Sequence, residues 1–115
     1  ISAAIYQSNG IVSAVCHGNA ALINITLSDG SLLIKDKRVS AFSNEEEANL
    51  GPTEIIPFLL QDKLIERGAI YVPGKAWQEN VVVADRLITG QNPASAKKVA
   101  QSIIESLQKS YFSSI

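Results

Sequence analysis

The 115-residue chain contains no methionine, one cysteine and one histidine. A single cysteine excludes a disulfide within the chain, and it argues against a zinc site with the usual number of ligands. The net charge is −1 and no basic stripe is present, so nucleic acid is not an expected partner. No apolar run approaches the roughly 20 residues of a membrane span, and no signal peptide is found. We therefore expect a cytoplasmic protein without membrane contact.

Hydrophobic residues make up 46% of the chain and charged residues 18%, which suits one folded domain with a real core. Three observations indicate that this chain is a piece of a longer protein. It has no initial methionine, it has few strong strands, and no Gly-rich loop precedes Cys16. They predict that residues 1–115 are the C-terminal part of a single domain whose N-terminal half is absent from this chain.

Apolar periodicity and turn residues predict the local structure. A helix over 1–8 should end at Gly10, and a helix with an apolar stripe should start at Pro57 and end near Arg67. The last helix should begin at Asn92 and Pro93. Short strands are expected at 11–15, 32–34, 38–42 and 69–72, with a hairpin formed by 81–83 and 87–89. This order predicts a mixed, mainly parallel α/β sheet.

The segment Ala14-Val15-Cys16-His17-Gly18 has the nucleophile-elbow pattern, with cysteine in place of serine. The chain should turn sharply from strand to helix there, and larger side chains at positions 14 and 18 would collide. The turn should expose the Cys16 thiol near a helix N-terminus, where peptide dipoles favour the thiolate. The alternative is a buried structural cysteine.

His17 is the candidate acid–base catalyst, because imidazole titrates near neutral pH. Its backbone N–H is also a candidate oxyanion donor. The alternative for His17 is a helix-start histidine bonded to a carbonyl. A catalytic imidazole needs an orienting carboxylate, and Glu45, Glu46 and Glu47 are candidates, of which at most one should point inward. Ser43 or Asn44 should cap this acidic segment.

For three other polar or aromatic residues, a structural role is favoured over a role in the site. Trp77 either lines a pocket or plugs the edge of the core, and we favour the core. Asn92 and Ser95 should cap the last helix.

The chain resembles the ThiJ/PfpI superfamily, which is class I glutamine-amidotransferase-like, and within it the glyoxalase III and heat-shock chaperone branch. The resemblance covers essentially the whole chain. It is carried by the Cys-His-Gly elbow and by segments in the same order: Leu27-Ser28-Asp29-Gly30, Phe42-Ser43-Asn44-Glu45-Glu46-Glu47, Ile56-Pro57-Phe58-Leu59-Leu60, Gly68-Ala69-Ile70-Tyr71 and Gly90-Gln91-Asn92-Pro93-Ala94-Ser95.

This resemblance implies a flavodoxin-like sandwich about twice as long as this chain, which is near the upper end of the usual range of domain lengths. It also implies that the protein forms homodimers. It implies a triad of Cys16, His17 and Glu47, with Glu46 as the reserve acid. A further glutamate near the thiol would come from the N-terminal half. Asn19 is a departure, because many relatives have proline there, and we expect little effect on the chemistry.

The leading functional hypothesis is a glyoxalase that converts methylglyoxal, a small α-oxoaldehyde, to lactate without metal, glutathione or nucleotide. Cys16 would attack the aldehyde, His17 would move a proton and Glu47 would orient His17. One alternative is a holdase chaperone or an oxidation sensor that uses a low-pKa thiol. Another is a cysteine amidase, peptidase or deglycase.

Overall fold

The computed structural model describes residues 1–51 and 58–113. Its elements in chain order are α1 (Ser2–Gln7), β1 (Val12–Val15), the 3₁₀ helix η1 (Cys16–Leu22), β2 (Arg38–Val39), α2 (Asn44–Leu50), α3 (Leu60–Glu66), β3 (Ile70–Tyr71), β4 (Val81–Ala84), β5 (Leu87–Gly90), the 3₁₀ helix η3 (Pro93–Ser95) and α4 (Ala96–Ser113).

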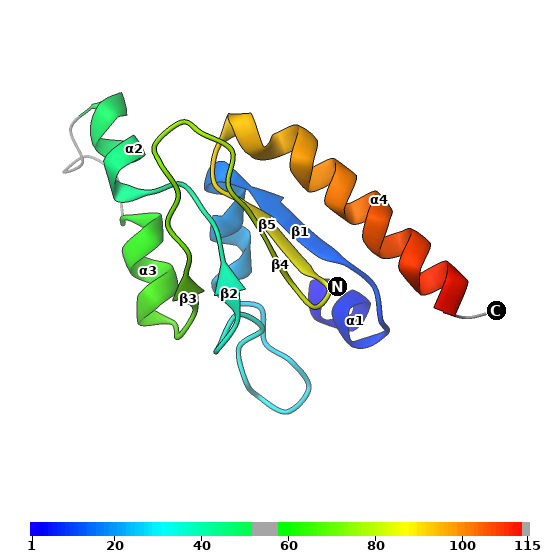
Figure 1. Cartoon of the computed structure of the whole chain (residues 1–115). Helices are drawn as coiled ribbons and strands as arrows, with labels where there is room; N and C mark the ends of the chain where they lie inside the picture. Colours follow the sequence, from blue (N-terminus) through cyan, green and yellow to red (C-terminus); the bar gives the residue numbers. More distant parts are fainter. Residues whose placement is uncertain (52–57, 114–115) are drawn as a thin grey trace.

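The main sheet has the strand order β1-β5-β4 (Figure 1). β1 and β5 are parallel and end together, with Val15 opposite Gly90, whereas β4 and β5 are antiparallel. β2 and β3 form a separate parallel pair. The predicted mixed, mainly parallel sheet is therefore confirmed.

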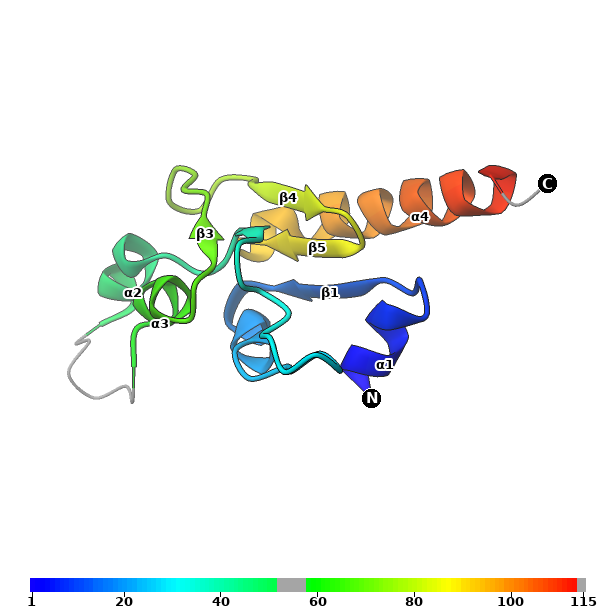
Figure 2. The same cartoon turned by 90° about the horizontal axis from the view of Figure 1, so that it is seen from below.

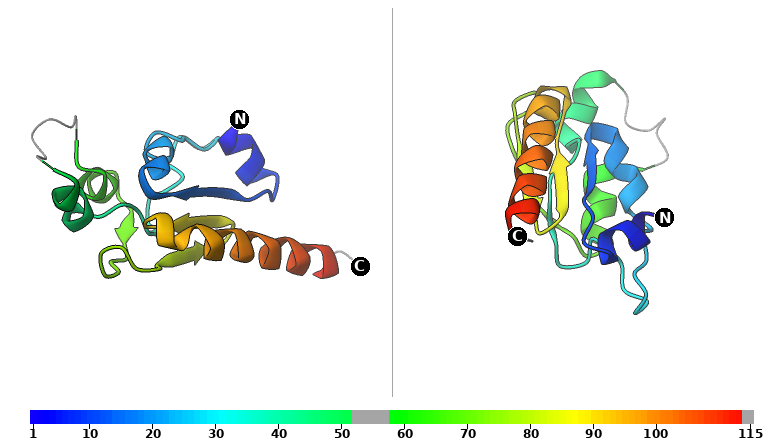
Figure 3. Two further views of the ribbon diagram at one scale, coloured as in Figure 1. Left: turned by 90° about the horizontal axis from the view of Figure 1, so that it is seen from above. Right: turned by 90° about the vertical axis from the view of Figure 1, so that its right-hand side faces the viewer.

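Helices cover both faces of the main sheet. Helix α4 runs along one face, while η1 and α1 lie on the other (Figure 3). Helices α2 and α3 pack together beyond the edge of the main sheet at which β1 and β5 end (Figure 2). The segment after β1 and the N-terminus of α2 are thereby brought to the same end of the sheet.

The predicted hairpin is present, with Val81–Ala84 paired to Leu87–Gly90. Asp85 in its turn has a φ of 55°, which is the left-handed conformation that tight hairpin turns require. Every residue of β5 is buried, because α4 covers one face and the neighbouring strands flank both edges. β5 is thus the central strand and fixes the position of β1.

Two predicted strands are wrong or too long. Leu33 and Ile34 lie in a turn, and Leu32 makes only an isolated bridge to Thr26. Both turn residues are nevertheless completely buried, so their apolar character reflects burial rather than strand pairing. The strand expected at 38–42 ends at Val39, and the following residues are buried without pairing regularly.

The helix predicted to start at Pro57 begins at Leu60, and Pro57 itself lies outside the described residues. Leu60 and Leu64 face the core, but Phe58 lies before the helix and is exposed, and Ile65 is half exposed. The apolar stripe is therefore narrower than predicted. The helix ends at Glu66, close to the predicted end at Arg67, and Gly68 follows with a φ of +95°. Among the described residues, no helix combines the length and the apolar character that crossing a membrane requires.

The end of β5 is tightly packed at Gly90. A Cβ added there would lie 2.7 Å from Val99 Cγ2 and 3.1 Å from Ser95 Cβ. In the protein that contains this chain, we expect Gly90→Ala to lower the free energy of unfolding by about 1–3 kcal/mol, as overpacking does. Chemical denaturation of this variant beside Gly18→Ala is the measurement, since a Cβ at Gly18 meets no atom within 4 Å. Equal losses in the two variants would contradict the crowding at Gly90.

Candidate active site

Cys16 lies at the turn between β1 and η1 and has a φ of 59°. For a residue with a side chain, this left-handed conformation costs roughly 1–3 kcal/mol and persists only where the surroundings enforce it. Val15 before it is extended, with φ −133° and ψ 142°. The sharp turn predicted after the strand is therefore present, although it leads into a 3₁₀ helix.

The expected reason for a small residue at position 18 is not found. Gly18 has open space around its ideal Cβ position within the described part of the chain. Crowding by these residues therefore does not explain the glycine. Ala14, the other small position, packs against the core cluster.

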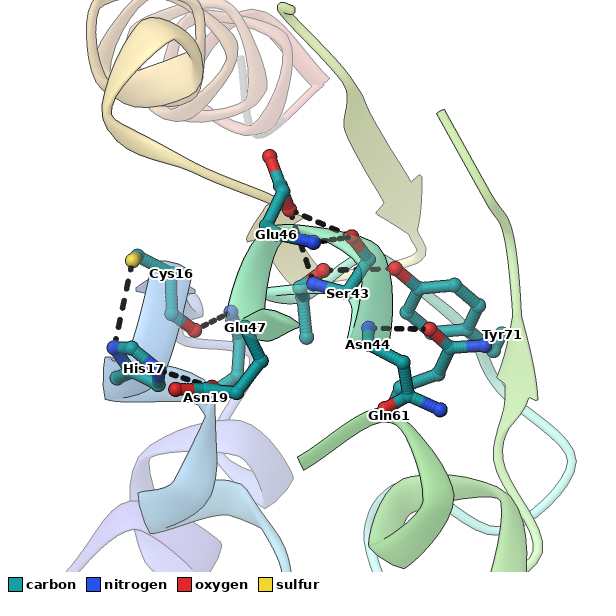
Figure 4. A network of polar contacts seen from close by, with 10 residues as sticks. Cys16, His17, Asn19, Ser43, Asn44, Glu46, Glu47, Gln61 and Tyr71 are labelled. Atoms are coloured by element: carbon teal, nitrogen blue, oxygen red, sulfur yellow. Dashed lines mark hydrogen bonds and ion pairs between the residues drawn. The ribbon is translucent and has the colours of Figure 1, made fainter. Parts of the chain in front are cut away.

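The structure brings Cys16, His17 and Glu47 together (Figure 4). His17 Nδ1 lies 3.9 Å from Cys16 Sγ, and His17 Nε2 lies 2.7 Å from Glu47 Oε2. An ionised Glu47 accepts a hydrogen bond from the Nε2–H, which leaves Nδ1 free to accept the thiol proton. The imidazole also packs against Phe42, with the ring centroids 4.2 Å apart. The adjacent residues Cys16 and His17 therefore do face one another.

Helix α2 supplies the carboxylate from its first turn. Ser43 caps this helix, and together with Glu46 it forms a capping box, in which each side chain binds the backbone N–H of the other. This confirms the prediction for Ser43. Because the cap fixes where the helix starts, it also fixes the direction of each glutamate. Glu45 points to solvent, and Glu47 reaches His17 with only 11% of its side chain exposed.

Glu46 points in a different direction from Glu47 and does not contact His17. It is completely buried, so the expectation that at most one glutamate points inward is wrong. Its Oε1 accepts from the Ser43 N–H and hydroxyl and from Gln91 Nε2, at 2.9–3.0 Å. Its Oε2 accepts from the Trp77 N–H and from Asn92 Nδ2, both at 2.7 Å. Glu46 therefore joins α2 to two other segments of the chain.

The capping role expected for Asn92 is also wrong. Its side chain makes no cap bond and instead donates to Glu46 and to the Gln78 carbonyl, because the buried carboxylate demands donors. The Ser95 hydroxyl bonds Asn80 and Asn92 rather than a free helix N–H. Trp77 does not plug the core, since it is 42% exposed and touches Phe42 edge-on.

Burial raises the pKa of Glu46, but hydrogen bonds from Ser43, Trp77, Asn92 and Gln91 outweigh it and hold that pKa below its ordinary value. The carboxylate thus stays charged, although among the described residues no cation pairs with it. A buried anion without a cation is stabilised only by such donors.

The Cys16 thiol does not have the low pKa expected from a helix N-terminus. Burial raises its pKa, a hydrogen bond from the His17 backbone lowers it, and the charges of Glu46 and Glu47 raise it further. The side chain is partly buried rather than fully exposed. Burial and the two nearby negative charges therefore disfavour a free thiolate at Cys16.

We expect the rate of Cys16 alkylation by iodoacetamide to rise with pH around a midpoint above that of an ordinary cysteine, since the thiolate reacts. Removing one nearby negative charge with Glu47→Gln should move this midpoint to lower pH. Mass spectrometry of the Cys16 peptide after timed labelling measures both midpoints. A wild-type midpoint below that of free cysteine would contradict the raised pKa.

Within the described residues, no three His, Cys, Asp or Glu side chains gather in a way that could hold a metal ion.

Comparison with known proteins finds relatives of this chain among glyoxalases. The chain is 37% identical to Glyoxalase 3 of Candida albicans over 94% of its own length, and 39% identical to a probable glutathione-independent glyoxalase of Schizosaccharomyces pombe over 92%. The crystal structure of glyoxalase III from Candida albicans matches with a TM-score of 0.83 and 35% identity, over 89% of this chain. These relatives are glutathione-independent glyoxalases of the ThiJ/PfpI family, and the chain is homologous to about half of each.

No family model matches the chain. The chain spans about half the length of the curated relatives it matches, namely 48% and 50% of the two named above. It likewise covers 45% of the glyoxalase III structure. The flavodoxin-like fold expected from the resemblance is confirmed by this structural match.

Proposed function

We propose that the protein containing this chain is a glutathione-independent glyoxalase that converts methylglyoxal to lactate. The observation that carries the proposal is the contact of His17 with both Cys16 and Glu47, at 3.9 and 2.7 Å. A thiol, a proton acceptor and an orienting carboxylate in this order form an activated nucleophile. The similarity to Glyoxalase 3 of Candida albicans supports the choice of reaction.

In the first step, His17 Nδ1 takes the Cys16 proton while the sulfur bonds to the aldehyde carbon, and the former carbonyl oxygen is protonated. The product is a hemithioacetal. The hydrogen on that carbon then leaves as a proton, and a proton is added to the neighbouring carbonyl carbon through the enediol. This isomerisation needs no external oxidant, because the aldehyde carbon is oxidised as the ketone carbon is reduced. Water finally cleaves the resulting thioester, which releases lactate and restores the thiol.

His17 suits the proton transfers because half of its side chain, 52%, is exposed and can reach a small bound substrate. Glu47 holds the imidazole through Nε2 and stabilises the positive charge that it carries between the two transfers. General acid–base catalysis of this kind contributes typically about 10²–10⁴-fold to a rate. The raised pKa of Cys16 makes the proton acceptor essential to the first step.

The decisive experiment measures methylglyoxal consumption and lactate formation by the full-length protein beside its Cys16→Ala variant. We expect turnover in the wild type and none above background in the variant. Absence of turnover in a wild type with a titratable free thiol would reject the proposal.

We further propose that the chain forms the C-terminal half of a single ThiJ/PfpI domain and that the complete protein is a cytoplasmic homodimer. The half-length match to the curated relatives and the resemblance of the ordered motifs support the first part. Light scattering of the full-length protein tests the assembly, with twice the monomer mass as the expected result. A monomer mass at micromolar concentration would exclude a stable dimer.

A further inference from the structure

The side chain of Asn19 joins the nucleophile turn to the end of β5. It is completely buried, and its Nδ2 donates to the carbonyl oxygens of Cys16 and Gly90, each at 3.0 Å. Carbonyl oxygens only accept hydrogen bonds, so the amide nitrogen must face both of them. One amide group thus links two parts of the backbone that are 71 residues apart in the sequence.

Gly90 is a firm anchor for this link. It is the last residue of the central strand and lies opposite Val15, the residue just before the nucleophile. Its α-carbon faces Val99 and Ser95 at distances that leave no room even for a methyl group. The Gly90 carbonyl therefore has little freedom to move, and Asn19 transmits that rigidity to the Cys16 peptide group.

The other end of the link is the strained residue. Cys16 adopts the left-handed conformation that a side chain disfavours, with a φ of 59°. Such a conformation needs contacts that hold it in place. The bond from Asn19 to the Cys16 carbonyl acts on the peptide group directly after the strained φ and ψ angles.

The oxygen of the Asn19 amide indicates that the contribution of this side chain comes from its nitrogen. Asn19 Oδ1 is buried and has no hydrogen-bond partner among the described residues. A buried acceptor without a partner is unfavourable, and an apolar side chain of similar size would avoid the cost. The asparagine is therefore useful at this position through the two bonds of its nitrogen.

We propose that Asn19 is a positioning residue that holds Cys16 in its left-handed conformation and so aims the thiol at His17. This inference rests on the proposed function and adds to it a residue that does not touch the substrate. It replaces the expectation that asparagine, standing where many relatives have proline, has little effect on the chemistry.

The test uses two variants of the full-length protein. Asn19→Ala removes both bonds without introducing a clash, and Asn19→Asp places an acceptor against the two carbonyls. For Asn19→Ala we expect kcat for methylglyoxal to fall about 10- to 100-fold while KM changes less than about threefold, because a small misplacement of a reacting group has effects of this size. For Asn19→Asp we expect the same loss, together with a shift of the Cys16 alkylation profile to higher pH.

Asn24→Ala is the matched control, since Asn24 is an exposed asparagine whose only described side-chain bond is with Arg67. It should keep the wild-type kcat and alkylation profile. A folded Asn19→Ala variant with wild-type kcat and wild-type alkylation, but a lower melting temperature, would overturn the proposal and leave Asn19 a scaffold residue. If the wild type does not consume methylglyoxal, the proposed function fails. An Asn19→Ala alkylation profile that differs from the wild type then still supports the positioning role of Asn19, and an identical profile rejects it.

Discussion

Replacing Glu47 by glutamine is expected to lower kcat for methylglyoxal by about 100-fold or more, the range lost when acid–base catalysis fails. Glutamine has the size of glutamate but carries no charge. It no longer stabilises a protonated His17, and its amide can present a donor to Nε2 and so favour the wrong tautomer. Steady-state kinetics of lactate formation measure the effect, and KM should change far less than kcat.

Glu45→Gln is the matched control for this experiment. It makes the same chemical change in the same helix, but Glu45 is exposed and makes no described contact with His17. The control should keep its kcat within about twofold, because exposed charges contribute little. Equal losses in the two variants would mean that net charge, and not the contact with His17, determines the rate.

Replacing Glu46 by glutamine is expected to lower the free energy of unfolding by about 3–5 kcal/mol, through the breakage of a buried polar network. The new amide nitrogen would face donors from Ser43 and Gln91 or from Trp77 and Asn92, whichever oxygen it replaces. Denaturant titration of the full-length protein measures the loss, and Glu45→Gln again provides the control. A loss below about 1 kcal/mol would show that the network tolerates a neutral residue.

The same variant should change the dependence of stability on pH. The pKa of Glu46 is lowered in the folded protein, so its charge stabilises the fold above the pKa of an unfolded glutamate. This contribution is lost as the pH falls through the lower, folded pKa. The difference in stability between wild type and Glu46→Gln should therefore be largest near neutral pH and shrink in acid. A difference that grows towards acid would contradict the lowered pKa.

The parts of the fold that the sequence predicted well depend on local patterns. The hairpin at Val81–Gly90 has apolar strands on both sides of a short polar turn, and the nucleophile elbow follows a short apolar strand. The contact between His17 and Glu47 followed from the resemblance, and only the structure established that the two side chains meet. Local patterns and known motifs therefore located the site.

The errors concern residues whose partners are distant in the sequence. Leu33 and Ile34 are apolar because a turn is buried, and periodicity alone does not distinguish such a turn from a strand. Asn92 matches the composition of a helix cap, yet a carboxylate 46 residues away takes its amide. Glu46 was expected only as the reserve acid for His17, with at most one of the three glutamates pointing inward. The buried Glu46 carboxylate accepts hydrogen bonds from residues in several separate segments, so the sequence around Glu46 alone does not predict its burial.

The parallel pairing of β1 with β5 has a consequence for how the protein acquires its reactive thiol. Cys16 is made before Gly90, which anchors its turn through Asn19 and lies 71 residues after Asn19 in the sequence. Closing so large a loop is entropically costly and makes folding slow compared with local pairing. If Asn19 holds the turn as proposed, we expect a nascent chain that has not yet added β5 to lack the left-handed conformation of Cys16. The conformation of the nucleophile would then depend on the addition of β5 and not only on formation of β1, the strand that precedes Cys16.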